Sequence, residues 1–110
     1  MTRSNDPKWW TEALELESAG KIEAAEKKIV HAVKDIGAYS QVAYLHELRM
    51  ARLIEQGDLK GARKAFDRAA DWLTRYASCA TSGGEGMALS AERAERLAVM
   101  QWAMDAAKKP

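Results

Sequence analysis

A pattern of one glycine with small and apolar residues occurs twice in this chain of 110 residues, at an offset of 37 positions. A glycine turns the chain tightly between two helices, small alanines let the helices approach, and a large residue fills the space to the next pair. Two copies of one helical hairpin are therefore predicted, at a length typical of stacked helix pairs. The matched pairs are Gly20 and Gly57, Ile22 and Leu59, Ala25 and Ala62, Ile29 and Phe66, Ala32 and Ala69, and upstream Leu16 and Leu53.

Good helix formers dominate the chain, so an all-α fold of five helices is predicted, as a single domain over residues 7–110 after a flexible segment 1–6. The two repeats cover about 7–37 and 40–77. Residues 79–89 read as a loop because their helix propensity is low, and 90–108 read as a C-terminal capping helix. Asp58 and Ser90 are the expected N-caps of the fourth and fifth helices, and Gly20, Gly37 and Gly57 the expected stops. The predicted helices are about 7–19, 22–35, 40–56, 59–77 and 90–108.

The balance of charged residues limits the classes of partner that the sequence predicts. Seventeen basic and 16 acidic residues give a net charge of +1. No basic block stands out, which disfavours a nucleic-acid partner. No apolar run approaches the ~20 residues that span a bilayer, and the first residues lack the apolar core of a signal peptide. Together with a single cysteine, these features predict a cytoplasmic protein.

The repeat resembles the tetratricopeptide (TPR) family, whose unit is a helix–turn–helix with conserved aromatic and small positions. The resemblance covers roughly residues 7–73. The closing proline of the family is absent, and the spacing is 37 rather than about 34 residues. The first copy matches with Trp9, Ala13, Ala25, Ile29 and Ala32; the second matches with Gly57, Asp58, Ala62, Phe66 and Ala69 but departs at His46, Arg49 and Met50.

The resemblance implies a partner-binding inner face, formed by the first helix of each hairpin. Trp9 takes the core position of the repeat, which places Trp10 elsewhere, either on this face or against the fifth helix. Such a face would be apolar with an acidic edge and would suit an apolar or basic segment. The implied binding residues are Trp10, Leu14, Glu17, Tyr44, Glu47, Ala51 and Ile54.

The predicted function is therefore non-catalytic protein–protein binding through this face. A concrete version is a small bacterial adaptor, or an immunity protein or antitoxin that occludes a toxin's site. One alternative is a structural homo-dimer that uses the same face. Another is an enzyme that uses Cys79 or the glycine-rich segment. If that segment is instead a contact loop for a protein, the residues concerned are Thr81, Ser82, Gly83, Gly84 and Glu85.

The residues that could carry chemistry lack the patterns that chemistry needs. Cys79 has no base beside it in sequence, and His31 and His46 form no metal-ligand motif, so no catalytic group, metal or cofactor is predicted. The glycine-rich segment does not match a phosphate-binding loop. The acidic residues of the first hairpin read as solvated helix faces with i,i+4 pairs to lysines; they are Glu12, Glu15, Glu17, Glu23 and Glu26.

Overall fold

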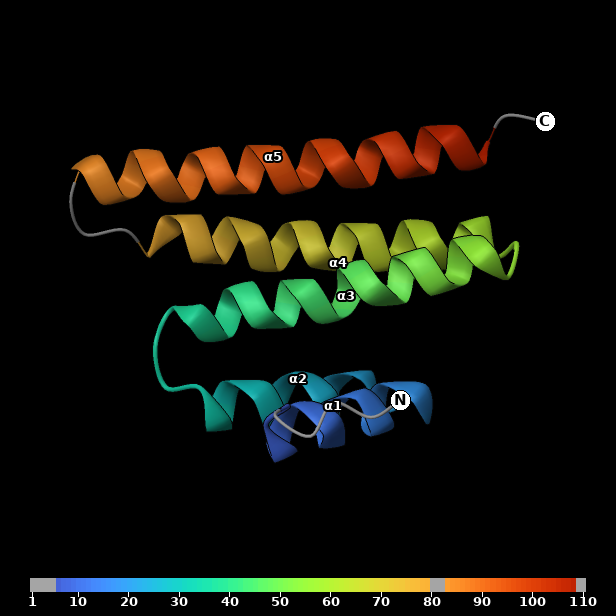
Figure 1. Ribbon diagram of the computed structural model, residues 1–110, viewed down its shortest axis with the longest axis horizontal. Coiled ribbons are helices and arrows are strands. Elements are labelled where there is room, and N and C mark those ends of the chain that lie inside the picture. The colour runs from blue at the N-terminus through green and yellow to red at the C-terminus, as the bar shows by residue number, and fades with distance from the viewer. Residues whose placement is uncertain (1–5, 80–82, 109–110) are drawn as a thin grey trace.

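The computed structural model describes residues 6–79 and 83–108, and helices make up most of both ranges (Figure 1). No strand occurs in the described part of the chain. The prediction of an all-α fold with five helices is confirmed for these ranges. The helices are α1 (Lys8–Ser18), α2 (Ile22–Ala32), α3 (Gly37–Glu55), α4 (Leu59–Ser78) and α5 (Gly83–Ala107).

The helices lie in successive layers (Figure 1). α1 packs against α2, α3 packs against α4, and α2 and α3 join the two pairs. α5 lies mainly on α4 and meets α3 at fewer points. Its opposite side faces outward at the end of the array and carries exposed apolar side chains.

The two tight turns have the same backbone geometry, 37 residues apart. Gly20 and Gly57 have φ angles of 83° and 80°, in the left-handed region that favours glycine. Each glycine N–H donates to the carbonyl three residues back, and the next N–H donates to the carbonyl five back, the Schellman ending of a helix. The offset found in the sequence is thus reproduced in both turns, although α3 and α4 are much longer than α1 and α2.

Two apolar clusters hold the layers together. α3 contributes to both of them, and the half-buried ring of Trp72 packs against both. The first cluster joins α1, α2 and α3 through Trp10, Ala13, Ala25, Ile29, Val42 and Leu45. The second joins α3, α4 and α5 through Ala43, Met50, Ala62, Ala65, Phe66, Ala69, Leu73, Met100 and Met104.

The boundary between α2 and α3 differs from the prediction. α2 ends at Ala32 rather than at Asp35, since Val33 is extended. Gly37 was expected to end a helix but begins α3 instead, because its N–H donates to Oδ1 of Asp35 at 2.8 Å. Ser40, the predicted first residue of this helix, therefore lies inside α3.

α5 also begins earlier than expected, at Gly83 rather than after Ser90. Residues 83–89 are therefore helical, not a loop, and Leu89 is buried. Packing overrides the low propensity of a glycine-rich first turn. Gly83, Gly84 and Glu85 form that turn, while Thr81, Ser82 and most of the segment 1–6 lie outside the described residues.

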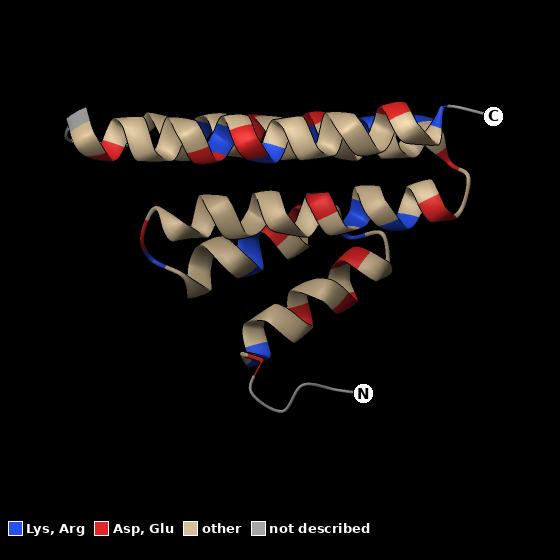
Figure 2. Cartoon of the chain, turned by 45° about the horizontal axis from the view of Figure 1, so that its top comes forward, with Lys and Arg blue, Asp and Glu red and all other residues tan. Residues whose placement is uncertain are grey.

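Charges are mixed along the helices rather than gathered into a stripe in the view of Figure 2. Within residues 6–79 and 83–108, no helix combines the length and the apolar character needed to cross a bilayer.

Asp58 is the predicted N-cap of α4, and its Oδ1 accepts from the N–H of Gly61 at 2.8 Å. We expect Asp58→Ala to lower the free energy of unfolding by about 1 kcal/mol, because an orphan helix N–H loses its acceptor. Urea unfolding followed by circular dichroism would measure this. Asp58→Asn should lose much less, and equal losses would contradict the capping role.

Candidate functional site on the inner face

The seven residues implied by the TPR resemblance all lie on α1 and α3, but their exposure varies widely. Tyr44 is 45% exposed, and Ala51, two turns further along α3, is also exposed. Leu14 and Ile54 are half-buried and pack against the apolar clusters. Glu17 is buried and Glu47 is half-buried. The face therefore mixes structural residues with a smaller set that a partner could reach.

The assignment of the tryptophan pair was wrong in orientation. Trp10, not Trp9, is the buried ring, at 8% exposure, while Trp9 is half-buried. The ring of Trp10 stacks on Tyr44 with centroids 5.8 Å apart and planes at 14°. Neighbouring residues on a helix point about 100° apart, so a modest rotation of α1 exchanges their roles. Trp10 does not pack on α5; it joins α1 to α3.

A pocket of about 510 Å³ adjoins this aromatic stack. Trp9 forms one side of it, with its ring 6.2 Å from that of Trp10 and nearly perpendicular to it. The described residues that line this pocket are Asp6, Pro7, Trp9, Trp10, Gln41 and Tyr44.

An apolar stripe runs along α3 beside this pocket. Leu48 is 39% exposed, one turn after Tyr44, and Ala51 follows one turn later. Residues spaced by three and four positions share one face of a helix. Leu48 is absent from the residues that the TPR resemblance implies for this face, although its spacing of four from Tyr44 places it there.

The acidic edge expected on this face is neutralised. Arg52 binds the buried Glu17 with two nitrogens, one of them at 2.8 Å. Arg96 of α5 binds Glu47. The hydrogen bonds that Arg52 donates to Glu17 raise the pKa of Arg52, against the lowering effect of burial. Both carboxylates therefore have partners, and the exposed large apolar side chains of this face are Tyr44 and Leu48.

A buried carboxylate, Glu26 of α2, lies at the centre of a polar cluster that sequence reasoning missed. Its oxygens accept hydrogen bonds from Arg68 at 2.6 and 2.7 Å and from the ring nitrogen of Trp72 at 3.0 Å. His46 Nε2 lies 2.7 Å from Oε2 of the same carboxylate. The helices α2, α3 and α4 are thereby tied to one side chain. The prediction that Glu17 and Glu26 lie on solvated faces was wrong, since both are buried.

Electrostatics keep Glu26 ionised. Burial acts to raise its pKa and is the largest single effect, but the hydrogen bonds and charges of His46 and Arg68 together lower the pKa to about 2. The same bond raises the pKa of Arg68. His46 is fully buried, and among the described residues its Nδ1 has no hydrogen-bond partner. The ring is held on its Nε2 side by Glu26, which fixes its orientation in the core.

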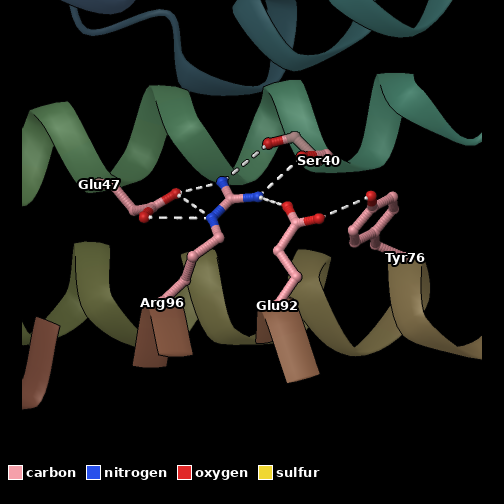
Figure 3. Close-up of polar contacts among 5 residues, drawn as sticks. All are labelled: Ser40, Glu47, Tyr76, Glu92 and Arg96. Atoms are coloured by element: carbon pink, nitrogen blue, oxygen red, sulfur yellow. Dashed lines mark hydrogen bonds and ion pairs between the residues drawn. The ribbon is translucent and has the colours of Figure 1, made fainter. Parts of the chain in front are cut away.

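A second polar cluster, centred on Arg96, fixes α5 to α3 and α4 (Figure 3). Its guanidinium donates to Ser40 Oγ at 2.7 Å, to the Ser40 carbonyl at 3.1 Å and to Glu92 at 3.0 Å, besides binding Glu47. Tyr76 donates to Glu92 at 3.0 Å. Burial, followed by this bond to Glu92, raises the pKa of Tyr76.

The side chains that could carry chemistry stay apart. Cys79 is half-buried beside a pocket of about 400 Å³ whose described lining contains no histidine. His31 is exposed on α2, whereas His46 is buried. Within the described ranges, no three His, Cys, Asp or Glu side chains are grouped so that they could hold a metal ion.

Comparisons with protein-family models, with curated proteins and with solved structures find no match for this chain. The resemblance to TPR proteins thus rests on the residues of the repeat alone.

Proposed function

We propose that this protein is a non-catalytic, TPR-like protein-binding module, which holds an apolar segment of a partner against the inner face of α1 and α3. The observation that carries the proposal is the exposure of Tyr44 and Leu48 one turn apart on a single helix. Tyrosine is among the residues that most often dominate the binding energy of protein interfaces, and the apolar Leu48 extends the contact surface beside it.

The buried surroundings of these anchors support a binding role. Tyr44 stacks on the buried Trp10, so its ring is held in one orientation. Arg52 bridges α3 to Glu17 of α1 on the same side. Anchors that are already ordered lose little conformational entropy when a partner binds, which favours affinity.

The polar groups support the non-catalytic part of the proposal. The buried carboxylates Glu17 and Glu26 are fully engaged with arginines, and His46 contacts Glu26. General acid–base work needs a group that can reach a substrate and exchange a proton. These groups instead hold helices together. In a concrete version of the proposal, the module covers a site on its partner, as an adaptor, immunity protein or antitoxin does.

The test compares binding to matched variants. A protein that the wild type captures from a lysate of the source cells is identified by mass spectrometry. Its affinity for the wild type and for each variant is then measured by calorimetric titration. We expect the Tyr44→Ala, Leu48→Ala double variant to bind at least about 30-fold more weakly, since loss of two anchors removes about 2 kcal/mol or more.

Trp102→Ala serves as the control, because it removes an even more exposed aromatic ring from α5, outside this face. It should bind the partner like the wild type. Circular dichroism verifies that every variant is folded. Equal capture of the same protein by the wild type and the double variant would show that the inner face is not the binding site.

A further inference from the structure

The outer face of α5 carries the most exposed large apolar side chains in the described part of the chain. Met87 is 77% exposed and Trp102 is 73% exposed, and Val99 follows at 62%. Between them, Ala91, Ala94 and Ala98 are also at least partly exposed. Positions 87, 91, 94, 98 and 102 share one face of the helix at spacings of three and four residues.

The outer face of α5 is more apolar than expected for a capping helix. The end of a helical array needs a polar outer surface to stay in water. On α5 the outer face carries few charges, chiefly Glu95 and Asp105, beside the apolar stripe. The expectation that α5 closes the array therefore holds for its inner side, which buries Leu89, Met100 and Met104, but not for its outer side.

We infer that a second copy of this chain binds to this outer face, with the two α5 helices antiparallel around a two-fold axis midway between residues 94 and 95. Apart from Ala94, whose equivalent position is Glu95, the stripe is symmetric about that point. Met87 and Trp102 are equally far from it, and so are Ala91 and Ala98. A two-fold interface must be complementary to itself. In this register Met87 meets Trp102 of the partner subunit at both ends, and alanine meets alanine near the centre.

The side chains suit such a contact. Alanines at the centre let two helix backbones approach closely, and large residues at the ends fill the space where the helices diverge. A thioether against an indole ring adds a favourable sulfur–aromatic contact.

The small area of the contact limits the expected affinity of this dimer. A helix of 25 residues is about 37 Å long and 10–12 Å wide, so the face covers roughly 400 Å² on each copy. This is less than the ~800 Å² per partner of a standard stable interface. The dimer should therefore be weak, half-dissociated on the order of 100 μM.

One charge opposes the pairing. Glu95 lies next to the proposed axis at the edge of the stripe, so the two copies of Glu95 come close to each other. Like charges at such a position weaken association. This register therefore predicts that removal of the charge by Glu95→Gln tightens the dimer by about two- to five-fold, as expected for exposed charge pairs.

Sedimentation equilibrium between about 5 and 500 μM, a range that brackets the expected dissociation constant, tests the inference. The wild type should show a rising average mass. Trp102→Ala should dissociate at least ten-fold more easily, as for an interface anchor. Leu48→Ala, which truncates an exposed apolar residue on the inner face, should leave the dimer unchanged. A wild type that stays monomeric throughout this range would overturn the inference. This holds even if Trp102→Ala fails to bind some other protein that the wild type binds.

Cysteine cross-linking tests the register, in a Cys79→Ser background that removes the native thiol. Ala94→Cys should form a disulfide-linked dimer, because both copies of residue 94 lie beside the axis. Ala106→Cys should not, because its two copies lie about 35 Å apart in this arrangement. Cross-linking of both variants would indicate a parallel pair, and cross-linking of neither would place the contact elsewhere; each result overturns the inference. Either failure leaves the inner-face proposal intact, since Tyr44 and Leu48 take no part.

Discussion

Glu26→Ala is expected to destabilise the protein by about 3–5 kcal/mol, as is typical when one member of a buried ion pair is removed. The loss leaves the buried His46 and the ring nitrogen of Trp72 without their acceptor, while Arg68 keeps partial access to water. Domains of this size are stabilised by only about 5–15 kcal/mol in total. Urea unfolding followed by circular dichroism should show a much lower midpoint, or a chain that is already partly unfolded.

The pH dependence of stability provides the control. The carboxyl of Glu26 has a pKa of about 2 in the folded state and an ordinary value of 4.5. A lowered folded-state pKa contributes stability that is fully present above pH 4.5 and is lost as the pH falls toward 2, about 3 kcal/mol in all. In Glu26→Gln this part of the acid destabilisation should be absent. If the variant and the wild type lose stability equally between pH 4.5 and 2, Glu26 does not have this role.

Much of the fold could be predicted because its signals are local. Gly20 and Gly57 adopt positive φ in turns where each glycine was expected, and Asp58 caps α4 as predicted. These features depend on residues within a few positions of one another. A comparison of the chain with itself then extended these local signals to the 37-residue offset that both turns reproduce.

The Glu26 cluster could not be predicted, because its members are distant in sequence. His46 lies 20 residues from Glu26, and Arg68 lies 42 residues away. A charged residue on a helix is normally solvated, and only packing shows that α2, α3 and α4 enclose this one. One signal was present: His46 occupies the place of a core aromatic in the TPR pattern. A polar side chain at a core position requires a buried partner.

The errors at the tryptophan pair and at α5 have a common cause. Each prediction depended on the orientation or the length of a helix, and the apolar residues of these helices are not confined to one clear stripe. α5 has alanines around most of its circumference, so the sequence did not distinguish the side that contacts α4 from the side that carries Trp102. The polar cluster around Arg96 makes that choice, since it turns Arg96 and Glu92 toward α3 and α4 (Figure 3).

Arg96→Ala is therefore expected to release α5 and to lower the free energy of unfolding by about 2–3 kcal/mol. Arg96 is the single donor that joins Ser40, Glu47 and Glu92, and charged hydrogen bonds of this kind are each worth about 1.5–3 kcal/mol. The loss stays below that of a fully buried pair because Glu92 can reach water. Amide hydrogen exchange should show α5 opening before α3 and α4.

Arg93→Ala is the matched control, because Arg93 lies on the same helix and makes an exposed 3.3 Å hydrogen bond to Thr74. It should change stability by less than about 0.5 kcal/mol, the range for surface substitutions. If both arginine variants are equally stable, or if α5 stays protected in Arg96→Ala, apolar packing alone holds α5 in place. If α5 is released, the same variant should also weaken self-association, because the outer stripe is presented only while the inner side of α5 is docked.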